Sequence, residues 1–139
     1  MEGFRSREPF GEEGYRLVGA AIEVYNQMGG GLTEPIYQEC LELELELKGI
    51  PFDPFRELRT FYKGRELKKR YIPDLIVYEK IIAELKALKA LKALKSLEPE
   101  HESQLLNYMH LTRSPLGYLL NFSPKSGLQW RRFLLNEYL

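Results

Sequence analysis

Apolar residues in the first third of the chain recur at the three- and four-residue intervals that place side chains on one face of a helix. The first set comprises Val18, Ala21, Ile22, Tyr25 and Met28. Acidic residues at positions 12 and 13 and glycines at positions 29–31 are typical of the two ends of a helix. The pattern therefore predicts a first helix that ends at the glycines.

A second helical stripe follows, made of Ile36, Tyr37, Cys40, Leu41 and Leu45. Thr33 is a suitable N-cap, Pro35 is tolerated in the first turn, and Gly49 marks the end. Within this stretch, residues 41–47 alternate strictly between Leu and Glu, which is also typical of a strand. Because both residues favour helices and helix signals flank the segment, we predict that it is helical.

Three apolar runs between residues 51 and 86 predict three antiparallel strands. The first run ends at the turn Lys63–Gly64, and the second and third cover residues 71–78 and 81–86 with a short break between them. Side chains alternate between the faces of a strand. We therefore expect Glu84 and Lys86 to emerge on one side while Ala83 and Leu85 enter the core.

Leucine then recurs every third residue from position 85 to position 97, with lysines between. On a helix this spacing drifts by about 60° per step, so no long buried stripe results. We interpret residues 87–97 as an irregular or helical insertion, a Leu-Lys-Ala repeat that forms a solvated basic linker. The alternative is a basic strip that contacts the phosphate backbone of a nucleic acid, with Lys89 and Lys92 as contacts.

The remaining segments complete an α/β pattern. Residues 101–111 predict a helix, residues 116–122 a strand buried on both sides, and residues 128–139 a last strand or helix. The order of helix, helix, three strands, helix and strand predicts a sandwich in which a small mixed β-sheet is flanked by helices. The helix after Lys86 would supply the crossover between strands.

Composition limits the number of domains and the compartment. With 139 residues, of which 44% are hydrophobic, we expect a tail at residues 1–10 and a single domain at 11–139 that contains the insertion. The lone Cys40 excludes an internal disulfide and a zinc-binding cysteine cluster, as is typical of a reducing compartment. Neither a signal peptide nor a run of 18 apolar residues is found, so we expect a cytoplasmic protein without membrane contact.

Charge argues against a global attraction to nucleic acid. Twenty basic and twenty acidic residues balance, so any such contact must come from local patches. One patch comprises Arg65, Lys68, Lys69 and Arg70. It is either an ordinary solvated hairpin or an edge that contacts phosphates.

The candidate chemistry lies in the second and third strand runs. Asp74 follows Pro73, and Glu84 and Lys86 are two residues apart, so neighbouring strands would bring the three side chains together. Two carboxylates and an ammonium can hold Mg²⁺ or Mn²⁺ and direct a water molecule at a phosphodiester. The alternative is an acid that ends a strand and a surface ion pair. Glu34 is equally a first-turn acid that answers the helix dipole or a ligand.

Four motifs in the same order resemble the GxxExxY protein family, which is placed in the PD-(D/E)xK nuclease-like superfamily. They lie at residues 31–37, 71–74, 84–86 and 101–108, and the resemblance spans about residues 15–132. It implies a restriction-endonuclease-like fold with Asp74, Glu84 and Lys86 as the central triad. It also implies that Gln104 and Tyr108 match the QxxxY helix motif of the RecB-like and lambda-exonuclease-like branch. Glu34 matches a glutamate that such enzymes present toward the metal.

Two functions follow. The first is a nuclease that hydrolyses phosphodiester bonds of DNA, or less favourably RNA, with Mg²⁺ or Mn²⁺ on Asp74 and Glu84 and a second ion or bridging water on Glu34. Lys86 would position or deprotonate the attacking water, while Gln104 and Tyr108 would orient Lys86 or the phosphate. The second is a catalytically idle module that binds nucleic acid or a protein partner. Neutral charge favours the second, unless a homodimer or a partner supplies further surface.

Overall fold

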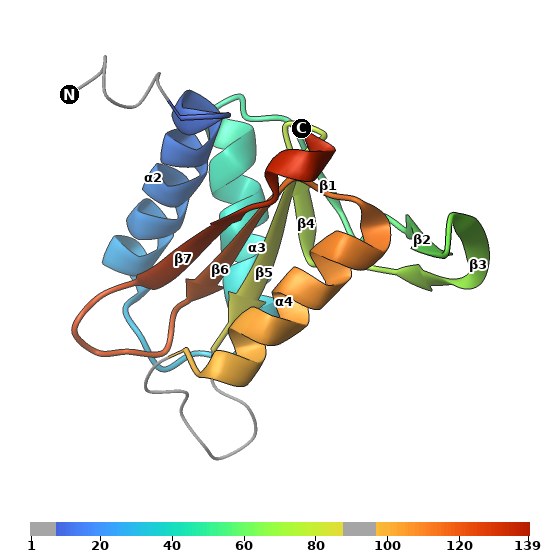
Figure 1. Cartoon of the computed structure of the whole chain (residues 1–139). Coiled ribbons are helices and arrows are strands. Elements are labelled where there is room, and N and C mark those ends of the chain that lie inside the picture. Colours follow the sequence, from blue (N-terminus) through green and yellow to red (C-terminus); the bar gives the residue numbers. More distant parts are fainter. Residues whose placement is uncertain (1–7, 88–96) are drawn as a thin grey trace.

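The computed structural model describes residues 8–87 and 97–139. In chain order the elements are α2 (Gly11–Met28), α3 (Glu34–Leu47), β1 (Phe52–Pro54), β2 (Leu58–Tyr62), β3 (Arg65–Tyr71), β4 (Leu75–Val77), β5 (Ile81–Lys86), α4 (Pro99–Thr112), β6 (Leu116–Asn121), β7 (Gln129–Leu134) and the 3-10 turn η1 (Asn136–Tyr138). They form three layers, with α2 and α3 on one face of a central sheet and α4 on the other (Figure 1). The predicted α/β sandwich is confirmed, and it is consistent with a restriction-endonuclease-like fold.

The central sheet is mixed and has the strand order β1-β4-β5-β6-β7. Strands β5 and β6 are parallel, with Ile81 opposite Leu116, whereas the other neighbouring pairs are antiparallel. Parallel neighbours need a long connection, and α4 provides it, as predicted. The crossover places α4 over the face of the sheet on which Glu84 and Lys86 of β5 lie.

Both N-terminal helices begin and end where the sequence predicts. The positive φ of Gly29, 70°, ends α2, and the Gly29 N–H donates to the Tyr25 carbonyl at 2.7 Å. Thr33 is the N-cap of α3, and residues 41–47 are helical. The predicted apolar stripes are wider than the buried faces, because Ile22, Met28 and Ile36 are exposed.

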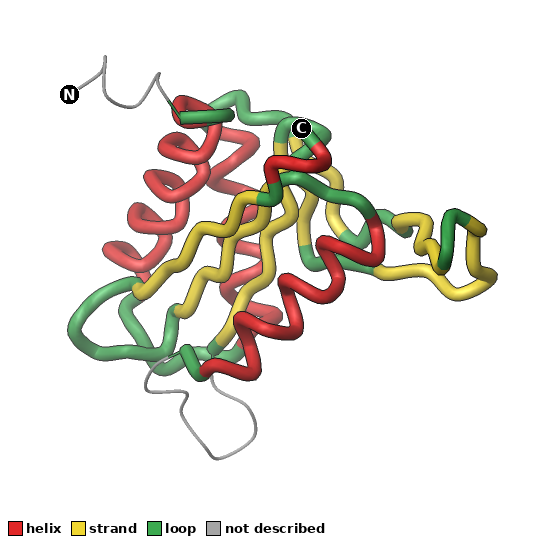
Figure 2. The backbone as a smooth tube through the Cα atoms, in the orientation of Figure 1, coloured by secondary structure: helices red, strands yellow, loops and turns green. Residues whose placement is uncertain are grey.

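The segment predicted as three strands forms five. Strands β2 and β3 pair only with each other and project from the body as a hairpin that turns at Lys63–Gly64, while β1 and β4 join the central sheet (Figure 2). The predicted strand at 71–78 is wrong, because Tyr71 ends β3 and β4 begins only at Leu75. Pro73 has no N–H for a ladder, so the chain can leave one sheet here and enter the other.

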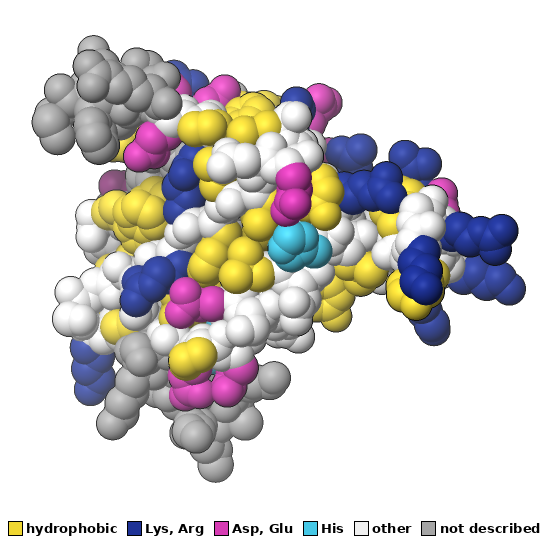
Figure 3. Space-filling view, viewed as in Figure 1, with side chains coloured by type: hydrophobic (Ala, Val, Ile, Leu, Met, Phe, Trp, Pro, Cys, Tyr) yellow, Lys and Arg dark blue, Asp and Glu magenta, His cyan; other side chains and the backbone are white. Residues whose placement is uncertain are grey.

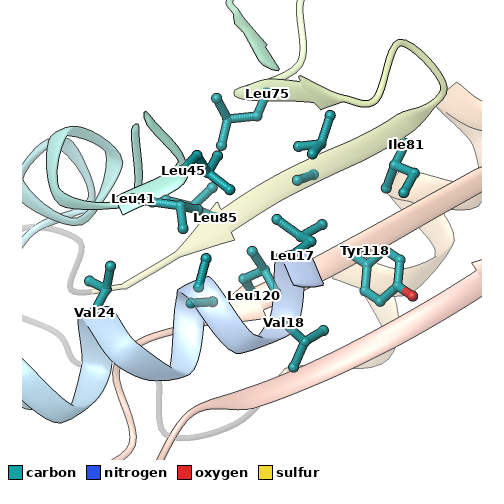
Figure 4. Close-up of a cluster of buried hydrophobic side chains, with 14 of the residues drawn as sticks. Leu17, Val18, Val24, Leu41, Leu45, Leu75, Ile81, Leu85, Tyr118 and Leu120 are labelled. Carbon is teal, nitrogen blue, oxygen red and sulfur yellow. The ribbon is translucent and has the colours of Figure 1, made fainter. Parts of the chain in front are cut away.

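The two faces of the sheet have separate cores. The larger lies under α2 and α3 and contains Leu41, Leu45, Leu75, Ala83 and Leu85 among its buried residues (Figure 4). The smaller lies under α4 and contains Ile82, Leu105, Met109 and Leu119, with Gly117 beneath them. A Cβ on Gly117 would lie 2.7 Å from the Met109 sulfur, so glycine permits the close approach of α4.

The Leu-Lys-Ala insertion lies mostly outside the described residues, which omit positions 88–96. Its two ends are buried, Ala87 in the core under α2 and α3 and Leu97 in the core under α4. The prediction that residues 87–97 are solvated is therefore wrong at both of its end residues. Residues 128–139, predicted as a strand or a helix, contain β7 followed by the turn η1. Within the described ranges, no helix is long and apolar enough to cross a membrane.

Candidate active site

Asp74 and Glu84 face each other across two neighbouring strands. Leu75 pairs with Ala83, so the residue before β4 lies opposite the residue after Ala83 on β5. Glu84 Oε1 accepts a hydrogen bond from the Asp74 N–H at 3.1 Å, and Asp74 Oδ2 accepts one from the Leu85 N–H at 2.8 Å. An N–H group on each side therefore binds the carboxylate of the other, and the two acids lie on neighbouring strands as expected.

A pocket of about 170 Å³ lies between this part of the sheet and α4. Its lining comprises Tyr71, Glu84, Lys86, His101, Gln104, Leu105, Tyr108 and Leu119. Glu84 and Lys86 point away from the larger core, in which Ala83 and Leu85 are buried, so the expected division of β5 is confirmed. Strand β5 thus forms one wall and α4 the other. Four of the five predicted catalytic residues meet in this space.

Tyr71 is a pocket residue that the sequence analysis did not propose for the site. Its hydroxyl donates to Glu84 Oε1 at 2.7 Å, and its ring stacks on Tyr108 with centroids 4.1 Å apart and an angle of 6°. A buried tyrosine usually finds a partner for its hydroxyl. This rule and the position of Tyr71 three residues before Asp74 could have indicated a role in the site. An aromatic residue at the end of an apolar run is, however, equally typical of a hydrophobic core. Tyr108 is thereby linked to Glu84 through Tyr71.

The charges in the site are only partly balanced. Burial and the nearby Asp74 carboxylate raise the pKa of Glu84 to about 7, against the lowering effects of the Tyr71 hydroxyl and the Lys86 charge. Burial also raises the pKa of Asp74, while the Leu85 N–H and Lys86 lower it. Burial and the charge of Glu84 raise the pKa of Tyr71 well above its usual range, so Tyr71 is a hydrogen-bond donor at neutral pH. A further positive charge between the carboxylates would relieve this repulsion.

Helix α3 contacts the site through Gln38. The Gln38 amide donates to the Asp74 carbonyl at 3.0 Å and to the Glu42 carboxylate at 2.8 Å. Glu34 lies one turn earlier on α3, is half-buried, and does not line the pocket between β5 and α4. The sequence offered no signal for Gln38, because its partner is 36 residues away.

The predicted phosphate-contacting residues lie apart from the pocket. Lys68, Lys69 and Arg70 are exposed on β3 of the projecting hairpin, and Arg70 pairs with Glu66 at 3.0 Å. Lys89 and Lys92 lie outside the described residues. The hairpin and the pocket nevertheless share one residue, because Tyr71 both ends β3 and binds Glu84.

The donor set fits one hard cation with few protein ligands. The described part of the chain contains no group of three or more His, Cys, Asp or Glu side chains placed to hold a metal ion. Glu84 supplies one carboxylate to the pocket lining, and Asp74, which is not part of that lining, supplies a second one beside Glu84. Mg²⁺ is commonly held by one or two carboxylates, with water and substrate phosphates as its other ligands. The pair therefore fits a cation whose shell is completed by water and substrate.

Comparison with known proteins places the chain in a family. A family model described as the PD-(D/E)XK nuclease superfamily matches residues 11–133. The chain belongs to this superfamily. The match includes all of the pocket residues and the hairpin. No curated protein matches the chain.

A solved structure supports the fold of this superfamily member. The match is to "Crystal structure of SSO0001", with a TM-score of 0.53 and 22% sequence identity. The match covers 74% of this chain and 51% of that one, so this chain spans about half the length of that neighbour. At this identity the likeness concerns the fold. Membership of the superfamily itself suggests a nuclease, and divalent metals are common among PD-(D/E)XK nucleases.

Proposed function

We propose that the protein is a metal-dependent nuclease of the GxxExxY family that hydrolyses phosphodiester bonds of DNA. The observation that carries this proposal is the arrangement of Asp74 and Glu84 on facing strand ends, with Lys86 on the same side of β5 in a pocket beneath α4. Those three residues match the acid, acid and lysine positions of a PD-(D/E)xK motif. The domain at residues 11–139 would hold the complete site.

Asp74 and Glu84 would hold Mg²⁺ or Mn²⁺. When bound, such an ion lowers the pKa of a water molecule and offsets charge on the phosphate. The two carboxylates are fixed for this role by the N–H groups of Leu85 and Asp74. Glu34 remains a predicted ligand for a second ion or a bridging water, one helical turn from the glutamine that contacts Asp74.

Lys86 would position the attacking water and balance the charge that gathers on the phosphate. Its charge acts on both carboxylates, since it lowers the pKa of each. Gln104 lines the same pocket from α4 and would donate an amide hydrogen bond to the scissile phosphate. Tyr108 would act as a positioning residue, because its ring stacks on the tyrosine that binds Glu84.

Calorimetry with Mn²⁺ tests the metal ligands. We expect Asp74→Ala and Glu84→Ala each to abolish Mn²⁺ binding, because each removes one of two carboxylates. Asp53→Ala is the matched control, since Asp53 is an exposed acid on β1 that pairs with Arg56. Undiminished Mn²⁺ affinity in both site variants would remove the metal proposal. Circular dichroism of each variant checks that the fold is retained.

A cleavage assay with the same metal tests Lys86. We expect Lys86→Ala to keep Mn²⁺ affinity near that of the wild type and to lower DNA cleavage by about 10²-fold or more, as for one well-placed acid–base or electrostatic group. Lys80→Ala, on the exposed β4–β5 turn, removes the same charge away from the pocket. Equal cleavage by the Lys86 and Lys80 variants would reduce Lys86 to a surface residue.

A second candidate is an idle module that binds nucleic acid or a protein partner through the same fold. One observation favours it: both carboxylates already accept hydrogen bonds from the backbone, and the pKa of Glu84 is raised to about 7, so this acid is partly protonated near neutral pH. The calorimetric experiment separates the two functions. Wild-type protein that binds no Mn²⁺ at pH 8, where Glu84 is ionised, would favour the idle module.

A further inference from the structure

The hairpin of β2 and β3, residues 58–71, is called the arm below. It carries an unusual share of the positive charge. The arm contains six basic residues, Arg59, Lys63, Arg65, Lys68, Lys69 and Arg70, and one acidic residue, Glu66. The other 125 residues hold fourteen basic and nineteen acidic residues. A neutral chain is therefore divided into a positive arm and a negative remainder, and the basic side chains gather visibly on the arm (Figure 3).

The basic side chains of the arm are available to a partner. All residues of β3 except Tyr71 are exposed, and so are Arg59 and Lys63. Glu66 pairs with Arg59 and Arg70. Among the described residues, Lys68 and Lys69 form no ion pair through their side chains. These two lysines therefore keep a full positive charge in solvent at the outer strand of the arm.

Side chains of both strands of the arm contact the body of the molecule. The Arg113 side chain, at the C-terminal end of α4, lies over the Phe61 ring of β2 at 4.4 Å. The hydroxyl of the buried Thr60 donates to the Lys69 carbonyl at 2.6 Å, which ties the two strands together. At the end of β3, Tyr71 binds Glu84. These contacts join β2 to the end of α4 and β3 to the pocket.

The dimensions of the arm fit one form of nucleic acid. The seven residues of β3 span about 20 Å, which equals the rise of about six base pairs of B-form DNA. A two-stranded ribbon fits the B-form major groove, which is about 12 Å wide. The major groove of A-form RNA is too deep and narrow for side chains to read. The shape of the arm therefore favours duplex DNA over duplex RNA.

We propose that the arm enters the major groove of duplex DNA beside the pocket, and that Lys68 and Lys69 contact phosphates there. This inference rests on the proposed nuclease function and specifies its substrate class as double-stranded DNA. The arm supplies the positive surface that the remainder of the chain lacks.

Binding measured in EDTA tests the arm without cleavage. The probes are a DNA duplex of about two helical turns, one of its single strands, and an RNA duplex of the same sequence. The variant is Lys68→Gln with Lys69→Gln. Its matched control is Lys80→Gln with Lys125→Gln, which removes two exposed lysines from the β4–β5 turn and from the β6–β7 loop.

We expect the arm variant to bind the DNA duplex more weakly, with a slope of log K against log salt that is smaller by about 2, whereas the control keeps the wild-type slope. Equal slopes for the two variants would overturn the proposal. So would wild-type protein that binds the single strand or the RNA duplex as tightly as the DNA duplex, or that binds none of them. A separate Mn²⁺ cleavage assay distinguishes this failure from failure of the nuclease function, because cleavage could persist without arm contacts.

Discussion

The two faces of strand β5 serve different purposes, although their residues alternate along one short segment. Leu85 points into the larger core and packs with residues of α2 and α3, whereas Glu84 and Lys86 point into the pocket under α4. One face is closed by two helices and is entirely apolar at its centre. The other is covered by a single helix and leaves a polar space of about 170 Å³. Stability is thus concentrated on one side of the sheet and candidate chemistry on the other.

Matched leucine truncations should reveal this asymmetry most strongly. Leu85→Ala leaves a closed cavity in the larger core and should lower the free energy of unfolding by about 2–5 kcal/mol. Leu105 is equally buried, but it also lines the pocket, so water can enter the space that Leu105→Ala leaves. We therefore expect Leu105→Ala to lower the free energy of unfolding by about 2 kcal/mol, near the lower end of that range. Urea denaturation of both variants measures the difference.

The exposed Leu43 on α3 provides a control for the leucine experiment, because Leu43→Ala should change the free energy of unfolding by no more than about 0.5 kcal/mol. If Leu105→Ala cost as much as Leu85→Ala, the face under α4 would be as closed as the other, and the contrast between the two faces would disappear.

The next effect concerns Glu84 and its dependence on pH. Its pKa is raised from 4.5 to about 7 in the fold, so the folded state binds a proton more tightly than the unfolded state. This contribution to stability is complete below about pH 4.5 and is lost as the pH rises through about 7. A shift of this size corresponds to about 3 kcal/mol, and the raised pKa of Asp74 acts in the same direction.

Glu84→Gln should therefore stabilise the metal-free protein at pH 8, by up to about 3 kcal/mol, and change it little at pH 5. Denaturation in EDTA at both pH values measures this. Glu46→Gln, on the exposed side of α3, is the control. A Glu84 variant that is destabilised at pH 8 would mean that its carboxylate is structural, and the site face would then resemble the core face.

The smallest predicted effect concerns Tyr71. Its hydroxyl bond lowers the pKa of Glu84, so Tyr71→Phe should raise that pKa while the ring remains stacked on Tyr108. A net hydrogen-bond contribution of about 1 kcal/mol corresponds to a rise of about half to one pH unit. Carbon-13 NMR of the Glu84 carboxyl, titrated without metal, measures it. Tyr108→Phe keeps the stacking and should leave the titration of Glu84 unchanged.

Features that depend on local spacing were predicted from the sequence. Helices α2 and α3 have strong periodicity, and strands β5 and β6 are short apolar runs with clear boundaries, so the existence of all four followed from the pattern alone. The division at Pro73 did not, because residues 71–78 are continuously apolar apart from Pro73 and Asp74. Whether such a run stays in one sheet depends on pairing partners that are distant in the chain.

The residues of the candidate site also fall into those that local spacing predicted and those that it did not. Asp74, Glu84 and Lys86 were proposed from their spacing on adjacent strands, and the structure brings the strands together. Tyr71 and Gln38 were missed because their hydrogen bonds to Glu84 and to Asp74 span 13 and 36 residues of the chain. A sequence can indicate which acids share a strand face, but the groups that hold those acids come from the packing of whole elements.

The separation of charge between the arm and the remainder of the chain also affects how the molecule approaches other charged bodies. An isoelectric point near 6.8 describes only the sum of the charges. Because the arm is net positive and the remainder is net negative, the protein has a dipole, and the field of a polyanion exerts a torque on it before any contact is made. The molecule would turn its arm forward during the encounter and keep its acidic helices away. Neutrality in this protein is therefore compatible with a strongly preferred orientation.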